Sequence, residues 1–378
     1  KKITVPYAFE TKLSGIGDTS FHPWVWYRRA VPVTANWAGR RILLHFGAVD
    51  YRAMIWVNGR LAGQHEGGNV PIKLDITDFL TTGGPQVISV RAEDPPEDRY
   101  QPRGKQYWLP QSRGIFYTRT TGIWQPVWLE AAGSSYLDKL RTQTQPDGHV
   151  TFNTKIARPA AGLTLHATVK FKDKVVAEGS VAAAGERANL GLYVNDPVKW
   201  STGQGNLYDV AFELRRGAEV LDRVTSYYGY RAIHIENGRF HLNGRPTYLK
   251  MVLDQGYWME STITPPTDEA IQYDIKMTMD MGFNGARKHQ KLEDPRFLYW
   301  ADKMGFLVSS EMANAYLYDE DYAARFTREW IEAVERDVNH PSIIMWIPIN
   351  ESWGVSDVAD TRQTQHLKAL YHLTKSLD

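Results

Sequence analysis

A glutamate directly after a long apolar run is the first candidate for chemistry in this sequence. Residues 343–349 are all apolar, and Asn350, Glu351, Ser352 and Trp353 follow them. Such a run indicates a strand buried on both faces, which is typical of parallel sheets wrapped by helices. In barrels of that kind the carboxyl ends of the strands carry the chemistry. The pattern therefore predicts Glu351 as a catalytic carboxylate, Asn350 as a ligand-orienting donor and Trp353 as a sugar-stacking face.

A second interpretation explains Glu351 without chemistry. A glutamate near a helix N-terminus is favoured by the helix dipole, so Glu351 could simply cap the helix that follows. Three other polar residues, Asp254, Arg287 and Glu311, stand at or just after the ends of earlier predicted strands. Because strand ends meet at one face of a barrel, we expect these residues to line the same face as Glu351.

The region before residue 245 consists of short predicted strands separated by turn signals. This pattern predicts a jelly-roll-like β-sandwich over residues 1–132 and a seven-strand immunoglobulin-like sandwich, with a spacer role, over 133–231. Asn58-Gly59 is a two-residue hairpin signal, because a type I′ turn needs positive φ at both positions. We expect strands at 24–33, 41–46, 53–57, 72–75, 87–93, 124–130, 149–156, 164–171, 174–179, 208–215 and 219–230.

From residue 245 the predicted strands alternate with helices. Two Asn-Gly signals, at 237–238 and 243–244, first frame a short hairpin. Alternating strands and helices indicate parallel βα units, so residues 232–378 predict about the first half of a (β/α)8 TIM barrel. We expect strands at 247–253, 284–287, 306–310 and 343–349, and helices at 268–281, 295–304 and 322–339.

The composition narrows the classes of partner. The 378 residues carry a net charge of +1, and no apolar stretch approaches the ~18 residues of a membrane span, so we expect neither a nucleic-acid nor a membrane partner. Cysteine is absent, which excludes disulfides and thiolate metal sites. The 13 tryptophans and 20 tyrosines suit a carbohydrate-facing surface, although large sandwiches also use aromatic residues in their cores.

Several short stretches, in this order, resemble glycoside hydrolase family 2, which includes β-galactosidases, β-glucuronidases and β-mannosidases. The resemblance spans nearly the whole chain and implies two sandwiches followed by a catalytic barrel. The stretches are WYRR at 26–29, VNG at 57–59, GGNVPI at 67–72, TGIWQPVWLE at 121–130, LNGRP at 242–246, GFNGAR at 282–287 and NE at 350–351.

The resemblance implies a role for each strand-end residue. Glu351 matches the general acid/base, and Asn350 matches the residue that contacts the sugar hydroxyl next to the reacting carbon. Arg287 matches the arginine that orients the nucleophile, and Glu311 matches a glutamate that supports the pocket or a metal. A retaining glycosidase also needs a second carboxylate ~5 Å from the acid as its nucleophile. In this family it comes from strand seven, so we expect it beyond residue 378, either in a longer protein or on another chain that completes the barrel.

The sequence departs from the family pattern after the first two barrel strands. Residues 252–258 replace the Asn-Arg-His of the galactosidases, and the histidine after Arg287 is displaced by one position, to His289. A β-galactosidase-like activity is the first expectation, but the contacts to the far sugar hydroxyls must differ. Lys288 could favour an acidic sugar, although a solvated lysine is the simpler interpretation.

The remaining pocket candidates each have an ordinary structural alternative. Trp258 either belongs to the sugar subsite with Asp254 or packs beneath the rim, and His289 either lines the pocket or is a satisfied core histidine. Tyr316 follows Glu311 at the exit of the third strand and is predicted to line the pocket. In the long loop 94–108, Trp108 could reach across from the first sandwich to close the pocket. The charged residues of that loop, Asp98, Arg99 and Arg103, indicate a solvated run.

Two functional hypotheses remain at this stage. The first is a retaining exo-β-glycosidase that hydrolyses a terminal β-linked sugar of an oligosaccharide or glycoside. The second is a non-catalytic carbohydrate-binding or scaffolding protein with an incomplete barrel. We expect no cofactor, because no metal-ligand spacing is decisive, and a structural or site-bound cation stays open. A homo-oligomer would bury an open barrel flank. The sequence does not distinguish a cytoplasmic protein from one that is exported after signal removal.

Overall fold

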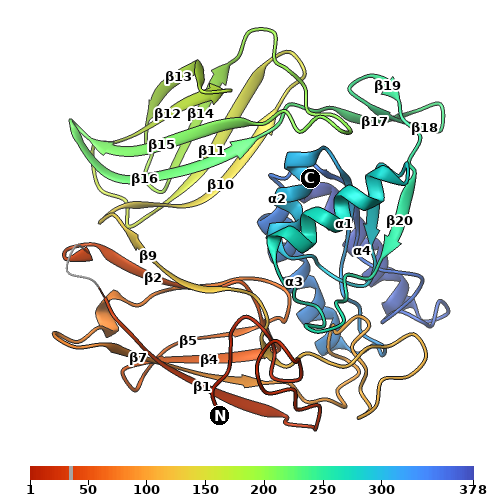
Figure 1. Ribbon diagram of the computed structural model, residues 1–378. Coiled ribbons are helices and arrows are strands. Elements are labelled where there is room, and N and C mark those ends of the chain that lie inside the picture. The colour runs from red at the N-terminus through yellow and green to blue at the C-terminus, as the bar shows by residue number, and fades with distance from the viewer. Residues whose placement is uncertain (34–36) are drawn as a thin grey trace.

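The computed structural model describes residues 1–33 and 37–378. Two β-sandwiches form one side of the molecule, and an α/β unit formed by the C-terminal part of the chain lies beside both of them (Figure 1). A long loop of the first sandwich, residues 94–121, extends toward the α/β unit. This loop brings residues of the first sandwich to the carboxyl ends of the barrel strands.

The first sandwich places a four-stranded antiparallel sheet against shorter sheets. Its core contains Ile55, Val90 and Phe46, which are at most 2% exposed. The Asn58-Gly59 hairpin is confirmed, because both residues have positive φ (52° and 80°) between two paired strands. The four-stranded sheet has the order β1 (Trp24–Val31), β7 (Gln86–Glu93), β4 (Arg52–Val57) and β5 (Arg60–Glu66). A three-stranded sheet has the order β6 (Ile72–Asp75), β2 (Arg41–Phe46) and β9 (Val127–Ala132), and a third sheet pairs β3 (Val49–Asp50) with β8 (Gly122–Ile123). A short 3-10 helix, η2 (Thr77–Phe79), follows β6.

The strand predicted at residues 124–130 is wrong in its first half. The chain leaves β8 at Ile123 and enters β9 only at Val127. Between them the side chain of Trp124 is fully buried, and its Nε1 donates to the carbonyl of Gly68 at 2.7 Å. Pro126 has no N–H to give to a ladder, which helps to separate the two strands.

The second sandwich has the seven strands expected of an immunoglobulin-like fold. One sheet contains β10 (Tyr136–Thr144), β11 (His149–Ala157) and β14 (Arg187–Tyr193), and the other contains β13 (Lys174–Ala182), β12 (Leu163–Phe171), β15 (Tyr208–Arg216) and β16 (Glu219–Tyr228). Phe152 and Phe212 meet edge to face between the sheets. Strands β10 and β14 were not among the predicted strands.

The α/β unit begins with a small antiparallel sheet and continues as four parallel βα units, which confirms the half-barrel. The small sheet is β17 (Ile233–Glu236), β18 (Arg239–Leu242) and β19 (Arg245–Pro246). The parallel sheet has the order β20 (Met251–Asp254), β21 (Gly285–Lys288), β22 (Leu307–Glu311) and β23 (Ile343–Ile347). The helices are α1 (Asp268–Asp280), α2 (Pro295–Met304), α3 (Glu320–Asp337) and α4 (Thr361–Leu377). The first strand, predicted from residue 247, begins only at Met251.

The helix ends follow ordinary capping chemistry. Side chains of Thr267, Asp294, Asp319 and Asp360 accept N-terminal backbone N–H groups of α1 to α4. Gly305 ends α2 in the left-handed conformation, directly after the predicted helix range 295–304. Within the described ranges, no helix combines the length and apolar character needed to cross a bilayer.

The register of the parallel sheet shows which side chains point toward the helices and which point to the inner face. Val252, Ala286, Val308 and Ile343 pair side by side and pack against the helices. The neighbouring row of Leu253, Arg287, Ser309 and Met345 therefore points to the opposite, inner face of the sheet. This alternation decides which strand-end side chains can meet at the site.

Candidate active site

Three of the predicted site residues meet at the inner face of the parallel sheet. Arg287, on β21, donates through Nε to Oε2 of Glu311 at 2.8 Å and through Nη2 to Oδ1 of Asn350 at 2.5 Å. Glu311 ends β22, and Asn350 follows β23. One guanidinium thus orients polar groups from two neighbouring strands, using its fixed fork of donors.

Glu311 is completely buried at this junction. Its second oxygen, Oε1, accepts the backbone N–H of Gln290 at 2.8 Å and lies 3.2 Å from Nδ1 of His289, without hydrogen-bond geometry. Burial raises the pKa of Glu311, and the bonds from Arg287 and Gln290 oppose that rise. Each carboxylate oxygen of Glu311 thus accepts one hydrogen bond, and its role in supporting a metal stays a prediction.

The surroundings of His289 favour its neutral form. Burial and the charges of Lys105 and Arg287 lower the pKa of its imidazole, against a smaller opposing effect of Glu351. The ring lies beside the site, with Nδ1 3.2 Å from Oε1 of Glu311. Its Nδ1 has no hydrogen-bond partner among the described residues.

A buried amide fixes the backbone on which Asn350 sits. Oδ1 of Asn314 accepts the N–H of Asn350 at 2.8 Å, and Nδ2 of Asn314 donates to the carbonyl of Pro348 at 2.9 Å. Gln290 in turn accepts the N–H of Asn314 at 2.9 Å. The Nδ2 group of Asn350 has no acceptor within the part of the chain that the structure describes. That amide nitrogen is therefore the donor left for a ligand.

Glu351 is exposed and adopts an unusual backbone conformation. Its φ is 56°, in the left-handed region that non-glycine residues seldom occupy. Such outliers gather at functional sites, where the surrounding structure holds them. Its Oε2 accepts from Nε1 of Trp353 at 3.3 Å. The helix-capping interpretation is wrong, because α4 begins only at Thr361 and is capped by Asp360.

The loop from the first sandwich is hydrogen-bonded to this edge of the barrel. The N–H of Gly104 donates to the carbonyl of Asn314 at 3.0 Å. The hydroxyl of Tyr316 donates to the carbonyls of Gly104 and Gln106, the latter at 3.1 Å. Gly104 has φ 59°, and a Cβ there would lie 2.1 Å from the carbonyl oxygen of Gln290. Only glycine allows this approach.

Aromatic rings from the loop and the barrel form a continuous group, the aromatic wall: Tyr107, Trp108, Phe116, Tyr316 and Trp353. The ring centroids of Trp108 and Tyr316 are 4.6 Å apart, and those of Tyr316 and Trp353 are 5.1 Å apart. The structure therefore brings Trp108, Tyr316 and Trp353 together beside Glu351. Trp108 reaches across from the first sandwich, as predicted.

Lys105 is a charged member of the site that the sequence reasoning missed. It is 4% exposed, and its Nζ lies 4.7 Å from the centre of the Trp353 ring. Burial lowers the pKa of its ammonium, while the charges of Glu351 and Glu311 oppose the change. Nothing in the run Arg-Gly-Lys-Gln distinguishes this lysine locally, and only docking of the loop on the barrel places it here.

Asp254 does not join the other strand-end residues. Its position in the register, beside Lys288, turns its side chain toward the helices. Its carboxylate is bound by Lys288, which also contacts Glu293 at 2.7 Å. Burial would raise the pKa of Asp254, but Lys288 outweighs it and lowers that pKa. A hollow of ≈ 440 Å³ beside Asp254, also lined by Phe297, thus lies on the helix side of the sheet.

Two other interpretations of charged residues are wrong. Lys288 is 2% exposed rather than solvated, and its ion pairs and its position 3.9 Å over the Phe297 ring leave it no role toward a sugar. Arg103, expected in a solvated run, is also 2% exposed and donates to the carbonyls of Pro95 and Pro96 at 2.9 Å. Both residues are structural cations inside the protein.

Trp258 lies in a turn after β20, where its backbone pairs with Thr262. The described contacts do not bring it together with Glu351, Asn350 or Arg287. Its place in a sugar subsite stays a prediction.

Three models of one protein family match successive parts of the chain. "Glycosyl hydrolases family 2, sugar binding domain" matches residues 4–100, "Glycosyl hydrolases family 2" matches 135–231, and "Glycosyl hydrolases family 2, TIM barrel domain" matches 233–378. The chain belongs to glycoside hydrolase family 2. The three matches also follow the observed order of jelly-roll sandwich, immunoglobulin-like sandwich and partial barrel.

Known family 2 proteins are similar over most of this chain. A β-galactosidase of Thermoanaerobacter pseudethanolicus is 26% identical over 342 residues, covering 86% of this chain and 44% of that protein. A β-glucuronidase of Streptococcus agalactiae serotype V is 24% identical over 364 residues, covering 86% and 58%. The structure of Bifidobacterium dentium β-glucuronidase complexed with coumarin-3-O-glucuronide has a TM-score of 0.87 at 19% identity, covering 100% and 67%. The chain spans about half the length of the curated relatives it matches.

Proposed function

We propose that this chain is part of a retaining exo-β-glycosidase and carries the acid/base side of its active site. The observation that carries the proposal is the fork of Arg287, which holds Glu311 and Asn350 together next to Glu351. Matching relatives bear the names of β-galactosidases and β-glucuronidases, and none of the findings favours a non-catalytic protein.

Each side chain then has a defined task. Glu351, on an exposed loop at the strand ends, protonates the leaving glycosidic oxygen and later removes a proton from the attacking water. Asn350 donates through its free Nδ2 to the hydroxyl next to the reacting carbon, since its Oδ1 is already bound by Arg287. The aromatic wall supplies stacking faces at the rim. His289 and Glu311 line the floor beside Arg287.

The second carboxylate would come from barrel strands that lie outside these residues. The inner face of the half-barrel supports this. Leu253 and Met345 are 56% and 43% exposed there, an apolar surface of the kind that further strands cover in a closed barrel. A nucleophile reaching the site from such a strand would approach Arg287, whose positive charge favours the ionised form of a nearby carboxylate.

A terminal β-galactoside is the first substrate class to test, and a β-glucuronide is the second. The relatives carry both names. The buried cation of Lys105 beside Glu351 is the feature of this chain that would suit an acidic sugar. A family 2 enzyme of either kind removes one sugar at a time if the aromatic wall closes the far side of the pocket.

The test is hydrolysis of 4-nitrophenyl β-glycosides by the complete protein, with Glu351→Gln as the key variant. Loss of a general acid costs about 10²–10⁴-fold in rate, and a glycoside with a poor leaving group should show the larger loss. Glu335→Gln, on the surface of α3, is the matched control and should keep full activity. The anomer formed first, followed by NMR, should be β. Equal rates for wild type and Glu351→Gln would overturn the proposal.

A further inference from the structure

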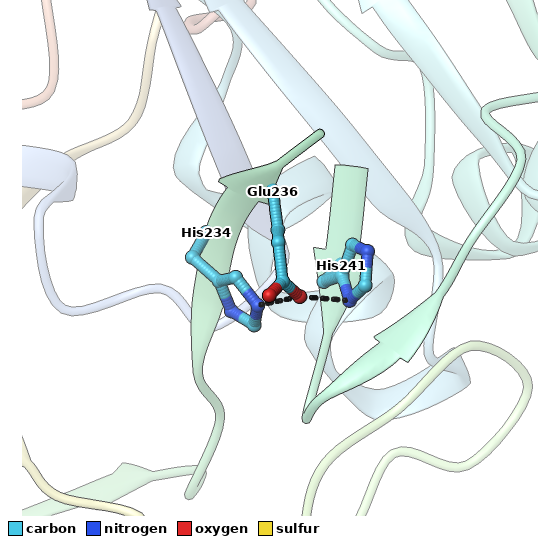
Figure 2. A group of neighbouring side chains, drawn as sticks. All are labelled: His234, Glu236 and His241. Atoms are coloured by element: carbon cyan, nitrogen blue, oxygen red, sulfur yellow. Dashed lines mark ion pairs between the residues drawn. The ribbon is translucent and has the colours of Figure 1, made fainter. Parts of the chain in front are cut away.

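The hairpin that leads from the second sandwich into the barrel carries three potential metal ligands on one face. His234 on β17 pairs directly with His241 on β18, so their side chains project from the same side of the sheet. Glu236 is two residues after His234 and therefore shares that side. Figure 2 shows the three side chains turned toward a common point. The turn residues Asn237 and Gly238, with φ of 50° and 69°, fix this register.

The distances between these side chains are close to those of a coordination sphere. Oε2 of Glu236 lies 3.8 Å from Nε2 of His234 and 3.8 Å from Nδ1 of His241. All three ligand atoms lie within 4.8 Å of one another. A tetrahedral zinc ion with bonds of ~2.1 Å holds its ligand atoms ~3.4 Å apart. Small side-chain rotations would therefore close the site.

His241 supplies an independent sign that a ligand belongs here. It is only 8% exposed, and its Nδ1 has no hydrogen-bond partner among the described residues. That nitrogen points at Glu236 across a gap too long for a hydrogen bond. A buried polar atom without a partner is costly, and coordination to a cation would satisfy it.

We propose that His234, Glu236 and His241 bind one divalent transition-metal ion of the zinc type. Two imidazoles and one carboxylate suit Zn²⁺, whereas Mg²⁺ and Ca²⁺ prefer all-oxygen sites. Three protein ligands leave the fourth position of a tetrahedral ion to water.

The position of the site gives it a structural role. The opposite face of the hairpin, with Ile233, Phe240 and Leu242, packs in a cluster with Trp200 of the second sandwich and Leu307 of β22. The hairpin lies at the amino end of β20, whereas Glu351 follows the carboxyl end of β23 (Figure 1). A bound ion would hold β17 to β18 and so stabilise the junction between the second sandwich and the barrel.

The test is titration of the EDTA-treated and dialysed protein with Zn²⁺ by calorimetry, and with Co²⁺ by its visible absorption. His234 is partly exposed, so His234→Ala should fold even if a variant of the buried His241 does not. His372→Ala, an exposed histidine on α4, is the matched control. We expect one Zn²⁺ per chain in the wild type and in His372→Ala.

His234→Ala and Glu236→Gln should each weaken Zn²⁺ binding by at least about tenfold. Loss of a residue that only hydrogen-bonds to a metal ligand already costs about 10–100-fold in affinity, and loss of a ligand itself should cost no less. Zn²⁺ should also raise the unfolding temperature of the wild type but not that of His234→Ala. Unchanged stoichiometry and affinity in both variants would overturn the proposal. So would a wild-type protein that binds no Zn²⁺ or Co²⁺ at all.

Discussion

The guanidinium of Arg287 donates through Nη2 to Oδ1 of Asn350 over 2.5 Å. An asparagine amide has an oxygen that accepts hydrogen bonds and a nitrogen of similar shape that donates them. A neighbouring cation binds the oxygen, so the nitrogen faces away from the cation. Here the oxygen faces Arg287, and the nitrogen remains for a ligand. The strand β21 thereby sets the hydrogen-bonding character of a side chain that follows β23.

Replacing Arg287 by lysine should therefore reduce turnover strongly. A lysine is a point charge and cannot hold Glu311 and Asn350 in one planar fork. We expect kcat/KM to fall about 10–100-fold, equivalent to about 1.4–2.7 kcal/mol of transition-state stabilisation. Steady-state kinetics on the best nitrophenyl glycoside would measure it. Arg52→Lys, at a half-exposed arginine of the first sandwich, should leave kcat/KM unchanged.

Substituting Gly104 by alanine should separate the loop of the first sandwich from the barrel. Gly104 and Gly114 both have positive φ, 59° and 63°, but only at Gly104 would a Cβ meet a neighbour, the carbonyl oxygen of Gln290. Gly114→Ala should cost about 1 kcal/mol from backbone strain. Gly104→Ala should cost about 1–3 kcal/mol more, because its methyl group overpacks the contact. Equal midpoints of urea unfolding for the two variants would contradict this prediction.

The sequence was informative where a local pattern determines the structure. The apolar run before Asn350 predicted a strand with polar groups at its carboxyl end, and the helix predicted at 295–304 has those bounds in the structure. The Asn58-Gly59 turn needed only the φ preferences of two residues. These features depend on neighbours in sequence, so a single chain reveals them.

The errors came from contacts between segments that are distant in sequence. Asp254 was predicted to line the site because it stands at a strand end. Side chains alternate between the two faces of a strand, and Asp254 pairs with Lys288 rather than with Arg287, so its side chain points to the helix side. Arg103 was predicted to be solvated and Lys105 was not singled out at all, and only the docked loop buries both of them. His234 and His241 become neighbours through the hairpin register, and their spacing fits no familiar ligand motif.

The interface between the first sandwich and α3 contains a carboxyl group whose ionisation opposes folding. Glu329 is 1% exposed, and its Oε1 accepts from the backbone and side-chain N–H groups of Asn69 at 2.8 and 2.9 Å. Its Oε2 has no partner among the described residues. Burial raises the pKa of Glu329 to about 7, with the Asn69 bonds opposing the rise.

Glu329→Gln should make stability less dependent on pH. A carboxyl whose pKa is raised on folding binds its proton more tightly in the native state, so stability falls as pH rises from the ordinary value of 4.5 to about 7. Above about pH 7 this contribution to the free energy of unfolding, roughly 3 kcal/mol, is lost completely. Unfolding temperatures at pH 5 and pH 8 should differ less in the variant. Glu335→Gln, on the surface of the same helix, should keep the wild-type difference.

Lys105 should control the pH dependence of activity. Its positive charge lowers the pKa of Glu311 and of His289. Removing a cation raises the pKa of the acids near it, including the nucleophile carboxylate that would approach Arg287. Because the acid limb of the kcat/KM profile reports ionisation of that nucleophile, Lys105→Met should move the limb to higher pH. We expect kcat/KM at neutral pH to fall about tenfold, or about 1.4 kcal/mol.

The matched variant for Lys105 is arginine, which keeps both the charge and the cation–π contact with Trp353. Lys105→Arg should restore the wild-type position of the acid limb, even where packing of the longer side chain lowers the rate. If methionine and arginine give the same profile, the charge of Lys105 does not act on the site, and its burial under the aromatic wall serves packing alone. A full pH–rate profile of both variants, measured on one substrate, decides between these outcomes.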